Sequence, residues 1–362
     1  MAKLTSREIL KMRIKRVEKE IRETPYHKGT QHHIGRLRAK LAHLKDSETE
    51  TSTKKSGSGT SYAVKKQGDA TIVLVGHPSV GKSTLLNRLT NARSKVAPYA
   101  FTTVTVIPGM MRYQDAQIQI LDVPGLIEGA EEGKGRGREV LSVARGADLL
   151  IILGDLERKS FDKIEEVLYG NGIRINKEPP KVEIEKKLSG GIIVHTNIKQ
   201  EIAKETIKEV ASEMGIKNAE IIIEEKLSLD RLIDAFSRSR VYVPGIFVVN
   251  KIDEKQALEK NPNHLYISAQ KGLGINALKK VLWQKIGFIR VYLVKEGEEP
   301  HFRNPIVMRK GQTLKNVATK IGSEFAANKK EAKIWGQTAK YPGQVISLAK
   351  EAKEGMQVTF LV

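Results

Sequence analysis

One short motif constrains the fold of this chain more than any other feature. The apolar run Thr71–Val75 is followed directly by GHPSVGKST and then by a helix-like segment, Ser83–Leu89. This is the G-x-x-x-x-G-K-[ST] pattern in a strand–loop–helix context, in which backbone N–H groups at a helix N-terminus surround a polyphosphate. Glycines allow the close approach. The sequence therefore predicts a phosphate-binding loop made of Gly76, His77, Pro78, Ser79, Val80, Gly81, Lys82, Ser83 and Thr84.

The surrounding segments predict an α/β fold. Continuous apolar runs recur at residues 149–153 and 246–249, a further strand is expected at 117–121 (QIQIL), and helix-like segments separate these strands. Strands without polar alternation are typical of a parallel sheet that helices cover on both faces. We therefore expect a parallel sheet with the phosphate-binding loop at the end of its first strand.

Two further elements are expected on the phosphate side of this site. Asp122-Val123-Pro124-Gly125 follows the strand at 117–121, so Asp122 is placed to hold Mg²⁺ through water and the Gly125 N–H to meet a γ-phosphate. Lys82 is expected to reach the β- and γ-phosphates and Ser83 to ligate Mg²⁺. In the preceding loop, Phe101-Thr102-Thr103 offers a hydroxyl that completes Mg²⁺ coordination only while a γ-phosphate is present, and we assign it to Thr103.

On the base side of the site, the sequence predicts a preference for guanine over adenine. Asn250-Lys251-Ile252-Asp253 follows the strand at 246–249, and the Asp253 carboxylate can accept both N1–H and N2–H₂ of guanine. Adenine has no such pair of donors, so it would leave Asp253 desolvated and unpaired. Asn250 is expected to tie the base loop to the phosphate loop, and the Lys251 stem to cover the purine. After a further short strand come Ser268, Ala269 and Gln270, and we expect the Ala269 N–H to donate to guanine O6.

The expected catalytic set is Lys82, Ser83, Thr103 and Gly125, and it lacks a residue that orients water. Leu126 and Ile127 follow the DVPG element, where many small GTPases have a glutamine. A leucine side chain cannot orient the attacking water. We therefore expect slow intrinsic hydrolysis of GTP to GDP, which a partner, a monovalent cation or rearrangement of the glycine-rich loop at 125–137 would raise.

The N-terminal part concentrates positive charge. The chain has a formal net charge of +20, and its first 66 residues contain 17 Lys and Arg against 7 Asp and Glu. Apolar residues repeat at helical spacing, which predicts two helices folded back as a basic hairpin. The repeats are Leu10, Ile14, Val17 and Ile21, then Ile34, Leu37, Leu41 and Leu44. A dimerising coiled coil is the alternative. The charge favours a polyanionic partner, most simply nucleic acid, and a solubility role is the alternative.

The chain is expected to divide into several parts. We assign a basic hairpin to 1–45, a Ser/Thr/Gly-rich linker to 46–68, and a nucleotide-binding domain to 69–158 and 241–295. The stretch between 159 and 240 is longer than crossover connections require, so we expect a small inserted α+β domain there. Residues 296–362 predict a β-grasp-like module.

Composition excludes some chemistry and bears on location. The chain has no cysteine, so disulfides, thiolate zinc sites and cysteine nucleophiles are excluded. No apolar run is long enough to cross a membrane, and the N-terminal residues do not form a signal peptide. We expect a cytoplasmic protein without membrane association.

These motifs together resemble a known family. GHPSVGKST, FTT, DVPGLIEGA, NKID and SAQ are similar to those of the Obg-type translation-factor GTPases, and most similar to the developmentally regulated GTP-binding (Drg) proteins of archaeal type. The resemblance covers nearly the whole chain. It implies a ribosomal-protein-S5-like insert, a TGS domain from about residue 296, GTP hydrolysis with Mg²⁺ on Ser83 and Thr103, and association with ribosomes or RNA. It also implies a small stabilising partner protein in eukaryotic relatives.

Alternatives remain open at this stage. Some related GTPases bind K⁺ through an asparagine that aligns with Ser79, so potassium stimulation is an expectation that this residue does not support.

The leading hypothesis is a monomeric GTPase switch that acts on ribosomes in translation or ribosome biogenesis. The second hypothesis is an RNA- or ribosome-binding scaffold with a structural, rarely hydrolysed nucleotide, and a third is a nucleotide-dependent dimer through the hairpin.

Overall fold

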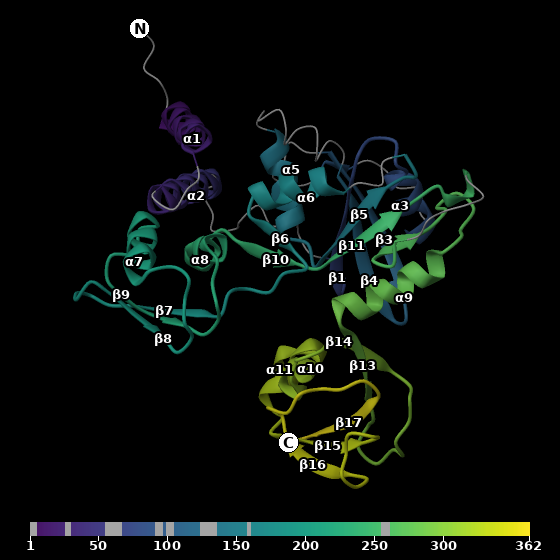
Figure 1. Ribbon diagram of the computed structural model, residues 1–362. Coiled ribbons are helices and arrows are strands. Elements are labelled where there is room, and N and C mark those ends of the chain that lie inside the picture. The colour runs from purple at the N-terminus through teal and green to yellow at the C-terminus, as the bar shows by residue number, and fades with distance from the viewer. Residues whose placement is uncertain are drawn as a thin grey trace. The chain divides into compact units, whose positions relative to one another are not determined.

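The computed structural model describes residues 6–25, 30–54, 67–90, 97–98, 105–123, 136–157, 161–254 and 261–362. The chain divides into two compact units (Figure 1). The first combines residues 1–62 with 172–242, and the second combines 63–171 with 243–362.

A seven-stranded sheet forms the centre of the second unit. The strand order is β12-β11-β5-β1-β4-β3-β2. Five of the strands run parallel, namely β1 (Ala70–Gly76), β4 (Ala116–Asp122), β5 (Leu149–Gly154), β11 (Gly245–Val249) and β12 (His264–Tyr266). The expected α/β class is confirmed, and the carboxyl ends of the parallel strands meet at one edge of the sheet.

The sheet is mixed, because two strands at one edge depart from the parallel arrangement that the sequence predicted. β3 (Thr105–Tyr113) pairs antiparallel with β4, and β2 (Ala97–Pro98) pairs antiparallel with β3. Gln114 and Asp115 join β3 to β4 and have φ of 46° and 68°. A two-residue turn with positive φ at both positions matches the twist of a hairpin, which makes its strands antiparallel.

Helices cover both faces of this sheet. Ile72 and Leu74 of β1 share a core with residues of α3 (Lys82–Thr90) and α9 (Ile275–Ile286). Val73 points to the opposite face and is also fully buried, so that face is covered too. The remaining helices of this layer system are α5 (Arg136–Arg145), α6 (Asp162–Gly170) and the short 3₁₀ turn η1 (Ile252–Glu254).

The C-terminal module is a five-stranded sheet with two helices. The strand order is β14-β13-β17-β15-β16. These strands are β13 (Phe288–Leu293), β14 (Pro305–Arg309), β15 (Glu331–Trp335), β16 (Gln344–Ser347) and β17 (Met356–Leu361), and the helices are α10 (Leu314–Ile321) and α11 (Ser323–Ala327). β13 lies inside this sheet, between β14 and β17, so the module begins at Phe288 and not at the expected residue 296.

Two helices pack side by side in the first unit, as the apolar repeats predict. α1 (Ser6–Glu23) contacts α2 (Gln31–Lys54), and Ile14, Val17, Ile34 and Leu37 are buried. α2 continues to Lys54, so the expectation of a linker from residue 46 onward is wrong for its first part. Asp46 is 7% exposed and makes tertiary contacts that hold this end of the helix.

The helical hairpin and the insert share one core. The insert has a three-stranded sheet in the order β7-β9-β8, formed by β7 (Val182–Lys186), β8 (Ile192–Thr196) and β9 (Ala219–Ile223). It also contains α7 (Lys204–Glu213), α8 (Leu229–Phe236) and the short paired strands β6 (Ile173–Ile175) and β10 (Val241–Val243). Ala39 and Ala42 of α2 join the insert's apolar cluster. The second segment of this compact unit begins at residue 172, whereas the sequence predicted that the insert begins at residue 159.

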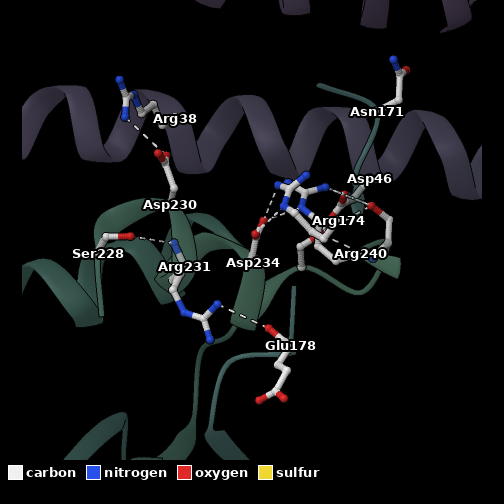
Figure 2. Close-up of polar contacts among 12 residues, drawn as sticks. Arg38, Asp46, Asn171, Arg174, Glu178, Ser228, Asp230, Arg231, Asp234 and Arg240 are labelled. Atoms are coloured by element: carbon white, nitrogen blue, oxygen red, sulfur yellow. Dashed lines mark hydrogen bonds and ion pairs between the residues drawn. The ribbon is translucent and has the colours of Figure 1, made fainter. Parts of the chain in front are cut away.

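A buried ion network joins α2 to the insert (Figure 2). Asp234 of α8 accepts hydrogen bonds from Arg174 and from Arg240, with N–O distances of 2.6 and 2.8 Å. Arg240 also pairs with Asp46 at 3.5 Å, and Asp46 accepts a hydrogen bond from the Ser237 hydroxyl at 2.6 Å. Because each charge in this chain of contacts has a partner, the network tolerates burial and fixes α2 on the insert.

Removing Asp46 should destabilise the first unit strongly. Asp46→Ala leaves Arg240 and Ser237 without one buried partner, which costs about 2–4 kcal/mol in the free energy of unfolding measured in urea. Asp230→Ala is the matched control, since Asp230 pairs with Arg38 at 3.3 Å but its side chain is 53% exposed. An exposed pair contributes less than about 1 kcal/mol. Equal losses in the two variants would contradict a stabilising role for the network.

Candidate functional site

The phosphate-binding loop joins β1 to α3. Gly76 ends β1, Lys82 begins α3, and the loop between them contains two residues with positive φ, Ser79 (62°) and Gly81 (95°). The Lys82 Nζ donates to the carbonyl oxygens of Gly76 and His77, at 3.0 and 2.9 Å. The loop therefore curves around this ammonium group, which places a positive charge beside the N-terminus of a helix. Both features favour an anion.

Ser83 and Asp122 meet as the sequence analysis expected for a magnesium site. The Ser83 hydroxyl donates to Asp122 Oδ2 at 2.6 Å. Asp122 is 2% exposed, and its Oδ1 is buried without a hydrogen-bond partner among the described residues. A hydroxyl beside a carboxylate with an unused oxygen is the oxygen donor set that Mg²⁺ and its waters prefer. These two residues therefore fit the metal.

Asn250 connects the base side of the site to the phosphate side. Its Nδ2 donates to the Val80 carbonyl at 2.9 Å, which is the link expected from the sequence. Its Oδ1 accepts the Ala269 N–H at 2.9 Å. The prediction that this N–H donates to guanine O6 is therefore not supported, because a buried amide already uses it. A Cβ at Gly81 would collide with the Asn250 amide, so only glycine fits at that position.

Asp253 lies on η1, one turn beyond Asn250. A hydrogen bond from the Ser268 hydroxyl lowers the pKa of Asp253, and Lys271, 3.6 Å away, adds to this effect. Asp253 therefore stays ionised at neutral pH, as an acceptor for two N–H donors requires. Lys251 has φ of 62°, and its Nζ lies 3.4 Å from the buried carboxylate of Asp155.

The structure adds residues to the site that the sequence analysis missed. Asp155 follows β5 directly, and Asp122 is the last residue of β4, so a position at the carboxyl end of a strand was the available signal. Lys271 follows the predicted Ser268–Gln270 element by one residue. Arg88 of α3 donates to the carbonyls of Ala269 and Gln270, and no sequence pattern pointed to it.

Several expected site residues lie outside the described residues. They are Phe101, Thr102, Thr103, Pro124 and Gly125, together with Leu126, Ile127 and most of the glycine-rich loop at 125–137. Their predicted roles stay predictions. The remaining elements are brought together at one edge of the sheet, since β1, β4 and β11 are parallel and their carboxyl ends carry Lys82, Asp122 and Asn250.

Comparison with known families identifies these parts. Residues 71–187 match the family described as 50S ribosome-binding GTPase, residues 189–288 match the C-terminal region of that domain, and residues 289–362 match the TGS domain. A GTP-binding protein of Methanocaldococcus jannaschii is 44% identical over 361 residues, covering 96% of this chain and 92% of the relative. Developmentally-regulated GTP-binding protein 2 of Homo sapiens is 38% identical over 344 residues, covering 93% and 94%. The chain belongs to the Drg family.

As a Drg protein, the chain is a GTP-binding protein with a GTPase domain and a TGS domain. Among solved structures, Aquifex aeolicus Era bound to GDP and AlF₄⁻ is 19% identical, with a TM-score of 0.33 over 75% of this chain and 73% of Era. The assignment to the Drg family rests on the sequence relatives. In the described part of this Drg protein, no helix is both long and apolar enough to cross a membrane.

Proposed function

We propose that this protein is a GTP-hydrolysing switch that associates with ribosomes or RNA in the cytoplasm. The Asn250 side chain carries this proposal, because it bonds to the phosphate loop through Val80 and to the base loop through Ala269. A ligand that occupies both halves needs a polyphosphate at one end and a purine with two donors at the other. GTP and GDP meet both requirements.

In this proposal, one group of residues contacts the phosphates and Mg²⁺, and another contacts the base. Lys82 now bonds to loop carbonyls, and it can turn from them toward the β- and γ-phosphates. Ser83 and Asp122 would hold Mg²⁺, which neutralises charge on the phosphate oxygens when it is bound. Asp253 selects the base, and Lys251, held by Asp155, covers its face.

We expect hydrolysis to be slow without an activator, because Leu126 stands where a water-orienting glutamine would be. Single-turnover hydrolysis of GTP with and without ribosomal subunits tests this part of the proposal. The expected result is a low basal rate that subunits raise by at least about tenfold. A basal rate that subunits, potassium or a partner protein never change would favour the scaffold role instead.

The basic helical hairpin supports a polyanionic partner. The hairpin is formed by α1 and α2, and part of its surface does not contact the insert. The cationic side chains exposed there are Arg13, Lys15, Arg16 and Lys40. The family description names the 50S ribosome, and this is consistent with such a surface. We propose that the hairpin, together with the TGS domain, contacts ribosomal RNA.

Neutralising this surface should weaken binding to ribosomal subunits. A variant with Arg13, Lys15, Arg16 and Lys40 each changed to glutamine should lose about tenfold in affinity at moderate salt and show a shallower salt dependence. The control changes Lys181, Lys186, Lys208 and Lys217, which are exposed on the insert, to glutamine. Co-sedimentation across a salt series measures both. Equal losses in the two variants would show that net charge matters and that the hairpin surface does not.

A further inference from the structure

The proposed function does not account for the hydrogen bonds that Arg88 makes in the nucleotide site. It lies in the second turn of α3, the helix that begins with Lys82. Leu85, Leu86 and Leu89 of this helix are buried, whereas Arg88 is exposed. Its Nε donates to the Ala269 carbonyl at 2.9 Å, and its Nη2 donates to the Gln270 carbonyl. One guanidinium thus binds two consecutive carbonyls of the base loop.

The base loop is shaped to receive this guanidinium. Its turn is closed by hydrogen bonds from the Ser268 N–H to the Leu273 carbonyl and from the Gly272 N–H to the Ser268 carbonyl. Gly272 has φ of 80°, and a Cβ there would lie 4.0 Å from Arg88 Cζ. The guanidinium therefore lies beside the glycine as well as the two carbonyls. Arginine suits such a position because its donors form a rigid planar fork.

The same turn holds the backbone donor that a guanine O6 requires. The Ala269 N–H is donated to Asn250, and the Lys271 N–H is donated to the Ser268 hydroxyl. The Gln270 N–H lies between them and has no hydrogen-bond acceptor in the part of the chain that the structure describes. The Gln270 N–H and the Ala269 carbonyl belong to the same planar peptide unit, so the hydrogen bond from Arg88 Nε to that carbonyl fixes the direction of the N–H.

We propose that Arg88 is a positioning residue for guanine recognition, which holds the 268–273 turn on α3 so that the Gln270 N–H meets O6 of the base. This inference rests on the proposed binding of a guanine nucleotide at this site. Arg88 does not touch the nucleotide in this arrangement. It fixes the base loop to the helix that carries Lys82 and Ser83, so the base and phosphate contacts keep a constant spacing.

The test separates recognition of O6 from recognition of the rest of guanine. Arg88→Met keeps the aliphatic stem and removes the donors, and Arg88→Lys restores the charge. Arg112→Met is the matched control, since Arg112 is exposed on β3 of the same unit. Equilibrium binding is measured for GDP, for 6-thio-GDP, in which sulfur replaces O6, and for IDP, which lacks the N2 amino group. Thermal unfolding is measured for each variant.

In Arg88→Met we expect GDP affinity to fall about tenfold and the preference for GDP over 6-thio-GDP to fall by a similar factor. The preference for GDP over IDP should change less than about twofold, because Asp253 on η1 reads N2. Arg88→Lys should recover part of the lost preference, and Arg112→Met should behave as wild type.

Two results would overturn the inference. One is GDP affinity in Arg88→Met equal to that of wild type. The other is an equal loss for all three nucleotides, which is the result expected if Arg88 only stabilises the fold. Failure of the proposed function would give a different result. In that case the wild-type protein itself would bind ADP as tightly as GDP, and this is measured before any variant is compared.

Discussion

Replacing Asp253 with asparagine should lower the affinity for GTP and GDP by about a hundredfold or more. The carboxylate can accept two N–H donors from guanine, whereas an amide would accept from one and turn its own N–H₂ toward the other. Xanthine has an oxygen where guanine has N2–H₂, so the same variant should gain affinity for xanthosine nucleotides. Competition binding with GDP, XDP and ADP measures all three effects.

Glu254→Gln, the adjacent acidic residue on η1, is the control for a general loss of negative charge. It should leave the order of affinities unchanged. Unaltered GDP binding in Asp253→Asn would remove the argument for base recognition.

The pH dependence of binding follows from the same carboxylate. Ser268 and Lys271 lower the pKa of Asp253, which means that its charged form persists further into acid than an ordinary aspartate. Guanine affinity should therefore be level from about pH 7 to about pH 5 and be lost only as the pH falls through this lowered pKa. Ser268→Ala removes the largest cause of the shift and should move the loss of affinity to higher pH. An unchanged profile in Ser268→Ala would contradict this account.

Replacing Asp122 with asparagine should slow GTP hydrolysis by about a hundredfold and weaken its dependence on Mg²⁺. Asp122 is buried, it accepts the Ser83 hydroxyl, and its second oxygen has no hydrogen-bond partner within the described residues. The amide keeps the size of the side chain and removes the negative charge that a metal-bound water would meet. Single-turnover hydrolysis over a Mg²⁺ titration gives the rate and the apparent metal affinity.

Asp115→Asn is the matched control for Asp122→Asn, because Asp115 lies in the β3–β4 turn just before β4, whose other end carries Asp122. Asn tolerates the positive φ of this position, so the control should fold and hydrolyse GTP as wild type does. A normal Mg²⁺ dependence in Asp122→Asn would show that this carboxylate does not face the metal.

The local motifs were readable from the sequence because their chemistry is confined to neighbouring residues. A strand, a glycine loop and a helix N-terminus follow one another in residues 70–90, and the structure places them in that order. The apolar repeats of the hairpin also have a local cause, since residues three and four apart share one helix face. The antiparallel β3 was missed because its direction depends on the turn at Gln114 and Asp115 and not on its own composition.

The sequence by itself determined the α/β class, the strand–loop–helix segment around Lys82, the acid Asp122 at a strand end and the place of the segment that contains Asp253. Each of these depends on short-range pattern and on the rule that parallel strands end at one edge of a sheet. Only the tertiary structure decided which donor meets which acceptor: Ala269 with Asn250, Arg88 with two carbonyls of the base loop, and Asp46 of α2 with the insert. These partners lie far apart in the chain, and their pairing is fixed by the packing of separate elements, which local pattern does not encode.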